Sequence, residues 1–264
     1  MTPAGVLDGL WILVSRPRAQ AASLSAAILA EGGQPLAFPL IDIEPPAHSD
    51  ELKAAMDELD GAALAIFVSG NAVSYALDYI LGRRGWPPSL AAATVGEQSA
   101  AALRARGLPG VIVPQGRFDS EALLALPELS DERVAGRTVL VFRGDGGREL
   151  MVDTLRARGA RVVPVTCYRR VPPADGAPLC RALAQGRLHA LTVTSSEAVR
   201  NLCHLPGLDC LDALRALPVF APHARIAEQA RAAGFSCVIE TDPADAGLMK
   251  GLVAYFSSSL RNLC

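Results

Sequence analysis

The chain has 264 residues, of which 50% are hydrophobic, and its net charge of -2 gives a pI near 6.1. A chain of this length can bury two cores of ordinary size, and a nearly neutral molecule has no overall field that would attract nucleic acid or a membrane surface. The N-terminus lacks the pattern of a secretory signal, and the longest apolar run is shorter than the roughly 18 residues that a membrane span needs. We therefore expect a soluble, cytoplasmic protein of one or two domains.

Short apolar runs alternate with segments of helical periodicity along the whole chain. In the first half we predict strands at 10–14, 64–68, 92–95 and 111–113, an extended segment at 36–43, and helices at 19–30, from 69–71 to 81 and from 96 to 107. In the second half we predict strands at 138–142, 190–194, 219–221 and 237–240, an extended segment at 161–168, and helices at 149–158 and 224–233. This alternation predicts an α/β fold with parallel sheets covered on both faces. Ligands of such sheets bind beyond the carboxyl ends of the strands.

The second half of the chain repeats the first at an offset of 127 residues. Residues 12–17 (ILVSRP) reappear as 139–144 (VLVFRG). The same offset pairs Gly32 with Gly159, Pro45 with Pro172, Pro46 with Pro173 and Gly107 with Gly234. A repeat this long is not a solenoid unit, so it predicts two similar lobes with a small-molecule cleft between them. The repeat alone would divide the chain near Val134.

Polar residues follow five of the predicted strands, and each group leads into a predicted helix. These groups are 15–16, 69–71, 96–99, 143–148 and 194–196. A helix N-terminus presents unpaired N–H groups and partial positive charge, so it can hold a carboxylate or phosphate. Each group alone also fits an ordinary N-cap. Their recurrence in both halves favours a rim that binds an anionic ligand.

Several common catalytic patterns are missing. The run 144–149 breaks the dinucleotide fingerprint, because Glu149 stands where the third glycine belongs, and there is no phosphate-binding G-x-x-x-x-G-K-[ST] loop. The four histidines lie far apart, and no G-x-S-x-G elbow is present. We therefore predict no metal and no organic cofactor. The six cysteines include no Cys-x-x-Cys pair, which predicts reduced thiols that are buried or idle.

Taken together, the polar strand ends resemble those of the uroporphyrinogen-III synthase family. The resemblance rests on 15–17 (SRP), 67–73 (FVSGNAV), 95–96 (VG), 120–124 (SEALL), 143–144 (RG), 147–149 (GRE), 168–170 (YRR) and 194–199 (TSSEAV). It implies two similar flavodoxin-like lobes, duplicated and segment-swapped, joined by two extended linkers at 39–44 and 165–171. Lobe one would contain 1–38 and 173–264, and lobe two would contain 42–168. A monomer without nucleic-acid or membrane partners is expected.

The resemblance also implies a reaction, the closure of the linear tetrapyrrole hydroxymethylbilane with inversion of its last pyrrole and loss of water. The substrate carries eight carboxylates, which suits a rim of helix N-termini and arginines. Tyr168 aligns with a cleft tyrosine of the family, so it is our candidate to assist departure of the hydroxyl group. An ordinary linker tyrosine that packs its ring is the alternative.

The remaining candidate site residues would hold the carboxylates of the substrate. Backbone and hydroxyl donors would come from Ser69, Asn71, Gly96, Ser99, Thr194, Ser195 and Ser196. Arg16, Arg143 and Arg148 would add charge, unless they pair with nearby acids instead. At the offset of the repeat, His223 and Ile226 replace Gly96 and Ser99, so the expected small hydroxyl is missing there and His223 is the substitute donor.

A function of a different class also fits two lobes without an obvious catalytic residue. Such a chain could be a non-enzymatic binding or sensor protein of the hinged, two-lobed type. The motifs at the strand ends favour the synthase, and product analysis with hydroxymethylbilane discriminates between the two.

Overall fold

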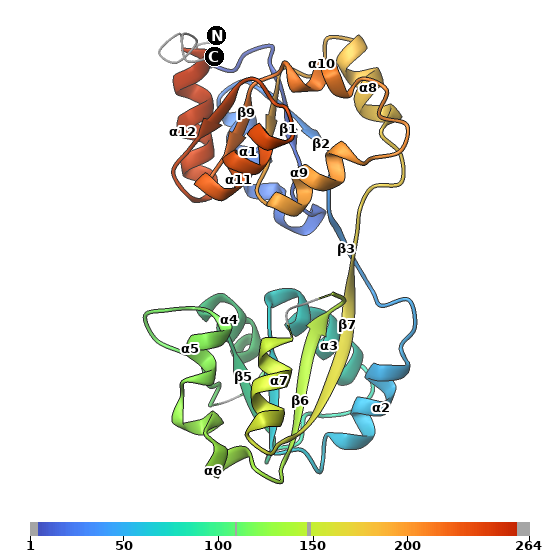
Figure 1. Ribbon diagram of the computed structural model, residues 1–264, viewed down its shortest axis with the longest axis vertical. Coiled ribbons are helices and arrows are strands. Elements are labelled where there is room, and N and C mark those ends of the chain that lie inside the picture. The colour runs from blue at the N-terminus through green and yellow to red at the C-terminus, as the bar shows by residue number, and fades with distance from the viewer. Residues whose placement is uncertain (1–4, 109, 147–148, 258–264) are drawn as a thin grey trace. The chain divides into compact units, whose positions relative to one another are not determined.

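The computed structural model describes residues 5–108, 110–146 and 149–257. The chain forms two compact units (Figure 1). The first unit combines Met1–Asp42 with Val171–Cys264, and the second is the continuous stretch Ile43–Arg170. No helix in the described ranges is long and apolar enough to span a membrane.

The first unit contains a five-stranded sheet in the order β10-β9-β8-β1-β2. Its strands are β1 (Trp11–Val14), β2 (Gln34–Ala37), β8 (Ala190–Thr192), β9 (Val219–Ala221) and β10 (Val238–Glu240). All of its strand pairs are parallel. The sheet therefore joins the beginning of the chain to its last third, because β1 pairs with β2 on one side and with β8 on the other.

Helices cover the sheet of the first unit. They are η1 (Arg18–Gln20), α1 (Ala22–Ala30), α8 (Ala177–Ala184), α9 (Ser196–Cys203), α10 (Leu211–Arg215), α11 (Ala224–Ala232) and α12 (Ala244–Phe256). Ile12 and Val14 alternate with Leu13 along β1, and they share a buried cluster with Leu24 of α1 and Leu248 of α12. Helices from the two ends of the chain thus pack into one core.

The second unit contains a sheet in the order β3-β7-β6-β4-β5. Its strands are β3 (Asp42–Glu44), β4 (Leu64–Phe67), β5 (Ala91–Thr94), β6 (Thr138–Gly144) and β7 (Arg161–Val171). The pairs of β4 with β5, β4 with β6, and β6 with β7 are parallel. The neighbouring strands β3 and β7 both cross the boundary between the units, at Asp42 and at Val171.

Alternate residues of β4 and β6 supply the two cores of the second unit. The helices are α2 (Asp50–Glu58), α3 (Gly70–Leu81), α4 (Glu97–Ala105), α5 (Ser120–Leu124), η2 (Pro127–Leu129), α6 (Asp131–Val134) and α7 (Leu150–Ala157). Phe67 and Phe142 share one buried cluster with α2, α3 and α4. Ile66 and Val141, on the opposite face, share another with α5, α6 and α7. Both faces of the sheet are covered, which explains why its strands read as continuous apolar runs.

Most of the expected strands are present within one or two residues of their predicted bounds. The strand predicted at 111–113 is wrong, because this segment forms only an isolated bridge between Ile112 and Ala93. The helices α2, α5, α6, α8, α10 and α12 were not predicted from the sequence. Four of these have eight residues or fewer, too short for a clear helical period, and α12 begins at Ala244 with an unusual φ of 66°.

The prediction of six reduced thiols is also wrong. Cys180 and Cys210 form a disulfide with a Cα–Cα distance of 5.4 Å, and Cys237 is disulfide-bonded as well. The two partners stand 30 residues apart in sequence, at α8 and immediately before α10, so only the tertiary fold brings them together. Cys167 and Cys203 are thiols, and burial raises the pKa of Cys167 to about 12.

Candidate active site

Serines follow the strands β4 and β8 and are the N-cap residues of the next helices, α3 and α9. Ser69 has an extended backbone, and its hydroxyl accepts a hydrogen bond from the N–H of Ala72 at 3.1 Å. Ser195 caps α9 in the same way, with the N–H of Ala198 at 3.0 Å. These are ordinary N-caps. The Ser69 hydroxyl makes a second contact, which the Ser195 hydroxyl lacks among the described residues.

This second contact is with Tyr168, whose phenol oxygen lies 3.1 Å from Ser69 Oγ. Tyr168 is only 2% exposed. Its ring packs against the backbone of Gly144, where an added Cβ would lie 2.5 Å from ring atoms Cε2 and Cζ. A glycine at position 144 is therefore required for the ring to occupy this place.

An irregularity in the pairing of β6 with β7 determines the direction in which the Tyr168 ring points. The register shifts between Arg143 and Gly144, so that the consecutive residues Cys167 and Tyr168 are both buried. Asp145 forms two hydrogen bonds with β7 beyond this register shift. Its N–H donates to the carbonyl oxygen of Tyr168 at 3.0 Å, and its carboxylate accepts from the N–H of Arg170 at 2.9 Å.

A cavity of about 170 Å³ lies beside Tyr168, at the end of β6. Its described lining residues belong to the second unit, and they are Val68, Ser120, Val141, Arg143, Gly144, Met151, Val152, Tyr168 and Arg170. A larger cavity of about 280 Å³ lies where β4, β5 and β6 begin, and its lining includes Leu64, Ala91 and Val139. We assign the site to the smaller cavity, because parallel sheets bind ligands at the carboxyl ends of their strands.

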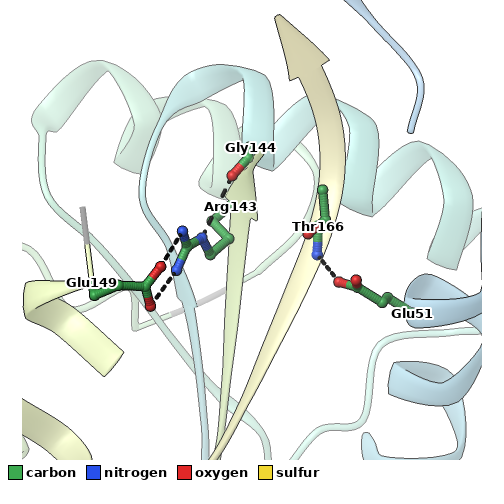
Figure 2. A network of polar contacts seen from close by, with 5 residues as sticks. All are labelled: Glu51, Arg143, Gly144, Glu149 and Thr166. Carbon is green, nitrogen blue, oxygen red and sulfur yellow. Dashed lines mark hydrogen bonds and ion pairs between the residues drawn. The ribbon is translucent and has the colours of Figure 1, made fainter. Parts of the chain in front are cut away.

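Arg143 lines this cavity, and its charge is engaged by a neighbouring carboxylate. Its Nη1 and Nη2 donate to the two oxygens of Glu149 at 3.0 and 2.8 Å (Figure 2). Hydrogen bonding in this pair raises the pKa of Arg143 and lowers the pKa of Glu149. Figure 2 also shows Glu51 accepting from the N–H of Thr166 at 2.6 Å on β7.

The other two predicted arginines are Arg16, in the first unit, and Arg148. Arg16 follows β1 in the first unit, and its Nη1 lies 2.6 Å from Asp245 Oδ1. Arg148 lies outside the described residues. The alternative left open by the sequence, that these arginines pair with nearby acids, therefore holds for Arg16 and Arg143.

Three further predicted residues of the second unit lie at the starts of helices. Asn71 is half-buried in the first turn of α3, and Gly96 is the N-cap residue of α4. Ser99, in the first turn of α4, is buried near the Ser69 turn, since a Cβ on Gly70 would lie 3.8 Å from Ser99 Oγ. Both turns thus meet at one edge of the sheet.

In the first unit, buried polar atoms without partners gather at the same kind of edge. Ser15 Oγ and Arg16 Nε follow β1, Ser196 Oγ begins α9, and none has a hydrogen-bond partner among the described residues. Thr194, between β8 and Ser195, is half-buried. His223 is exposed at the N-cap position of α11 without a capping bond, whereas Ile226 is buried. Unpaired buried donors are costly, so these atoms are well suited to an added acceptor.

Three residues that line the cavity were not predicted from the sequence as site residues: Gly144, Ser120 and Arg170. A signal for Arg170 was available, because a residue two positions beyond Tyr168 on a strand projects to the same face. Gly144 could not be recognised, since its role depends on contact with a ring 24 residues away. Within the described ranges, no group of three or more His, Cys, Asp or Glu side chains could hold a metal ion.

Comparison with known proteins places the chain in a family. The family model described as uroporphyrinogen-III synthase HemD matches residues 22–250. The uroporphyrinogen-III synthase of Escherichia coli is 34% identical over 196 residues, which cover 74% of this chain and 79% of that protein. The synthase of Salmonella typhimurium is 36% identical over 200 residues, with the same coverage of 74% and 79%.

Solved structures agree at the level of the fold. A uroporphyrinogen III synthase mutant from Thermus thermophilus superposes with a TM-score of 0.58 at 20% identity, covering 96% of this chain and all of that one. The Helicobacter pylori uroporphyrinogen-III synthetase gives a TM-score of 0.55 at 15% identity, with 93% and 99% covered. With a family model spanning most of its length, the chain belongs to the uroporphyrinogen-III synthase family.

Proposed function

We propose that this chain is a uroporphyrinogen-III synthase, which closes hydroxymethylbilane with inversion of the last pyrrole and loss of water. The family match over residues 22–250 carries the proposal. The geometry around Tyr168 supports it, because a buried phenol at the wall of a small cavity suits the release of a hydroxyl group without an additional charged acid.

The contacts of Tyr168 suggest how the phenol acts. Ser69 Oγ accepts a hydrogen bond from Ala72, so its own hydrogen remains available for the phenol oxygen 3.1 Å away. With this arrangement the Tyr168 hydroxyl hydrogen points to the substrate and assists the C–O bond to break, so that the oxygen departs as water. Loss of water leaves an azafulvene cation, which the substituted carbon of the terminal ring attacks to give a spiro intermediate. Opening of this intermediate and reclosure through the free carbon of the terminal ring give the inverted macrocycle, and the proton lost on reclosure restores the phenol of Tyr168. Because closure without inversion proceeds in solution, the protein contributes mainly by positioning the chain.

The carboxylates of the substrate would be held by donors at the strand ends of both units. In the second unit these are the turns that contain Ser69, Asn71, Gly96 and Ser99. In the first unit they are Thr194, Ser195 and the unpaired atoms of Ser15, Arg16 and Ser196. His223, exposed at a helix N-terminus, is a donor of the same kind. Each hydrogen bond to a charged group contributes about 1.5 to 3 kcal/mol, so the binding free energy is distributed over many groups.

We also infer that the two units are duplicated, segment-swapped flavodoxin-like lobes. With its strands numbered in chain order, the first sheet has the order 2-1-3-4-5 that is typical of flavodoxin. At the 127-residue offset, β6, β7, β4, β5 and the bridge at Ile112 correspond to β1, β2, β8, β9 and β10, and they have the same spatial order. Equivalent glycines share left-handed backbones, with φ of 82° and 80° at Gly32 and Gly159 and 85° and 91° at Gly107 and Gly234.

Product analysis tests the proposed function. Purified protein, incubated with hydroxymethylbilane in the presence of a chelator and without added cofactor, should give mainly the type III isomer by chromatography. The type I isomer alone, as in the reaction without protein, would contradict the proposal. That result, combined with tight binding of the tetrapyrrole, would favour the non-enzymatic binding protein instead.

A further inference from the structure

We propose that Arg170 binds a carboxylate of the substrate at the mouth of the Tyr168 cavity and so positions the reacting end of the tetrapyrrole. The inference rests on the proposed function, and it adds a positioning residue that neither the motifs nor the family match assigns. A polyanionic substrate needs a cation at this cavity, and the charge of Arg143 is already engaged by Glu149.

Arg170 has the position that this role requires. It lines the same cavity as Tyr168 and Gly144, and its guanidinium carbon lies 5.9 Å from the centroid of the Tyr168 ring. A cation within about 6 Å of an aromatic face is attracted to it, which draws the side chain toward the phenol. Because Arg170 follows Tyr168 by two residues on β7, both side chains project to the same face of the sheet.

The side chain of Arg170 is exposed and its backbone is fixed. Its N–H donates to Asp145 Oδ1 at 2.9 Å, and the N–H of Asp145 donates to the carbonyl oxygen of Tyr168. The two residues are therefore held by one loop. Among the described residues, no carboxylate forms an ion pair with Arg170. A guanidinium that is exposed, without an acidic partner and anchored at its backbone can take a substrate carboxylate through two parallel hydrogen bonds.

The size of the cavity indicates which part of the substrate is held. About 170 Å³ is less than the roughly 300 Å³ at which pockets for drug-sized ligands begin. The cavity therefore accepts one end of the linear tetrapyrrole and not the whole molecule. A carboxylate of that end ring, bound to Arg170, would bring the hydroxymethyl carbon to the phenol of Tyr168.

The chain offers a matched control on the same strand. Arg169, the neighbouring residue, carries the same charge but pairs with Glu44 at 2.6 Å. Arg170→Gln and Arg169→Gln thus remove equal charge from adjacent positions of β7, and only the first removes the proposed carboxylate contact. Arg170→Lys keeps the charge and loses the forked geometry.

Steady-state kinetics with hydroxymethylbilane, at low and high salt, tests the inference. Arg170→Gln should raise KM about 5- to 50-fold, because an exposed charge contributes less than a buried one, while kcat changes little. Arg170→Lys should recover part of that loss, and the salt dependence of KM should be weaker in Arg170→Gln than in the wild type. The fraction of type I product should rise, since weakly held substrate closes in solution.

The outcomes separate this inference from the proposed function. If the wild type forms the type III isomer and Arg170→Gln has the KM of Arg169→Gln, Arg170 binds no carboxylate and only the inference fails. A fall in kcat at unchanged KM also overturns it, because Arg170 would then act in the chemical step. If the wild type forms no type III isomer, the proposed function itself fails. Thermal unfolding of each variant shows whether a kinetic change reflects loss of the fold.

Discussion

At the scale of single residues, the phenol of Tyr168 is the group that we propose acts on the departing hydroxyl. Tyr168→Phe removes only its oxygen, so the ring still packs against Gly144 and the fold should remain intact. Assistance by a general acid is typically worth about 100- to 10,000-fold, and turnover should fall within that range. Initial rates should fall much less in Ser99→Ala and Thr194→Ala. Near-normal activity of Tyr168→Phe would exclude the phenol as the acid.

The hydroxyl of Ser69 combines a structural task with contact to the phenol, and the two can be separated. Ser69→Ala and Ser195→Ala each remove one N-cap, so both should lower the free energy of unfolding by about 1 kcal/mol. Only Ser69→Ala also frees the Tyr168 oxygen, 3.1 Å away, from its partner. We expect its kcat to fall about tenfold further than that of Ser195→Ala. Equal kcat values in the two variants would show that Ser69 does not orient the phenol.

Gly144 leaves the space that the Tyr168 ring occupies. A Cβ at this position would lie 2.5 Å from two ring carbons, so Gly144→Ala must displace the ring or the strand. We expect a loss of about 1 to 3 kcal/mol in stability, as for other overpacked sites, together with at least about a tenfold fall in kcat. Gly85→Ala is the control, because nothing lies within 4 Å of its added Cβ. Urea unfolding and initial rates measure both effects, and a fully active Gly144→Ala would contradict the placement of the ring.

At the scale of elements, the disulfide between Cys180 and Cys210 ties α8 to the start of α10. Its partners are 30 residues apart. Closing a loop of that length lowers the conformational entropy of the unfolded chain, which stabilises the fold by about 3 to 4 kcal/mol. Cys180→Ser with Cys210→Ser should therefore lower the free energy of unfolding by roughly that amount. The thiol variant Cys203→Ser should have a much smaller effect. Intact mass under non-reducing conditions reports the bond, and equal stability of the double variant and the wild type would contradict this role.

Some elements could be read from the sequence because one short-range signal defines them. The apolar runs of β1, β4 and β6 and the serine that begins α3 are of this kind. Other elements depend on partners that are distant in sequence, so no local sequence pattern predicts them. The segment around Ile112 is apolar like a strand, yet it reaches β5 through a single bridge. The cysteines had no local pair, and their pairing follows from the packing of α8.

The residues of the candidate site also fall into those that local sequence motifs predict and those that depend on distant contacts. Tyr168 and the strand-end serines could be named from motifs, whereas the position of Tyr168 at the wall of the cavity could not be predicted from sequence spacing. The bulge that buries both Cys167 and Tyr168 breaks strict alternation, so the face on which Tyr168 lies depended on the pairing with β6. The cations were the hardest to predict, because pairing with Glu149 or Asp245 decides which arginines keep an available charge.

At the scale of the whole molecule, the two units differ in how the chain supplies them. The second unit is the continuous stretch Ile43–Arg170 with cores on both sheet faces, whereas the first needs Met1–Asp42 and Val171–Cys264 together. A fragment of residues 43–170 should therefore unfold cooperatively in urea. A fragment of residues 171–264 should not, because it lacks β1, the strand between β2 and β8. Circular dichroism during urea titration measures both, and cooperative unfolding of the second fragment would contradict the topology.

The position of β1 within its sheet also sets an order of events during synthesis. The hydroxyl of Thr192 on β8 donates to the carbonyl oxygen of Leu13 on β1, a residue 179 positions earlier. At about 5 to 20 residues per second, the ribosome needs roughly 10 to 40 seconds to make that intervening chain. During this interval the apolar edge of β1 has no partner strand on that side, while the complete second unit emerges and can fold. Strand β1 thus leaves the ribosome long before β8 can pair with it, and the nascent chain is most exposed to chaperones and proteases in that window.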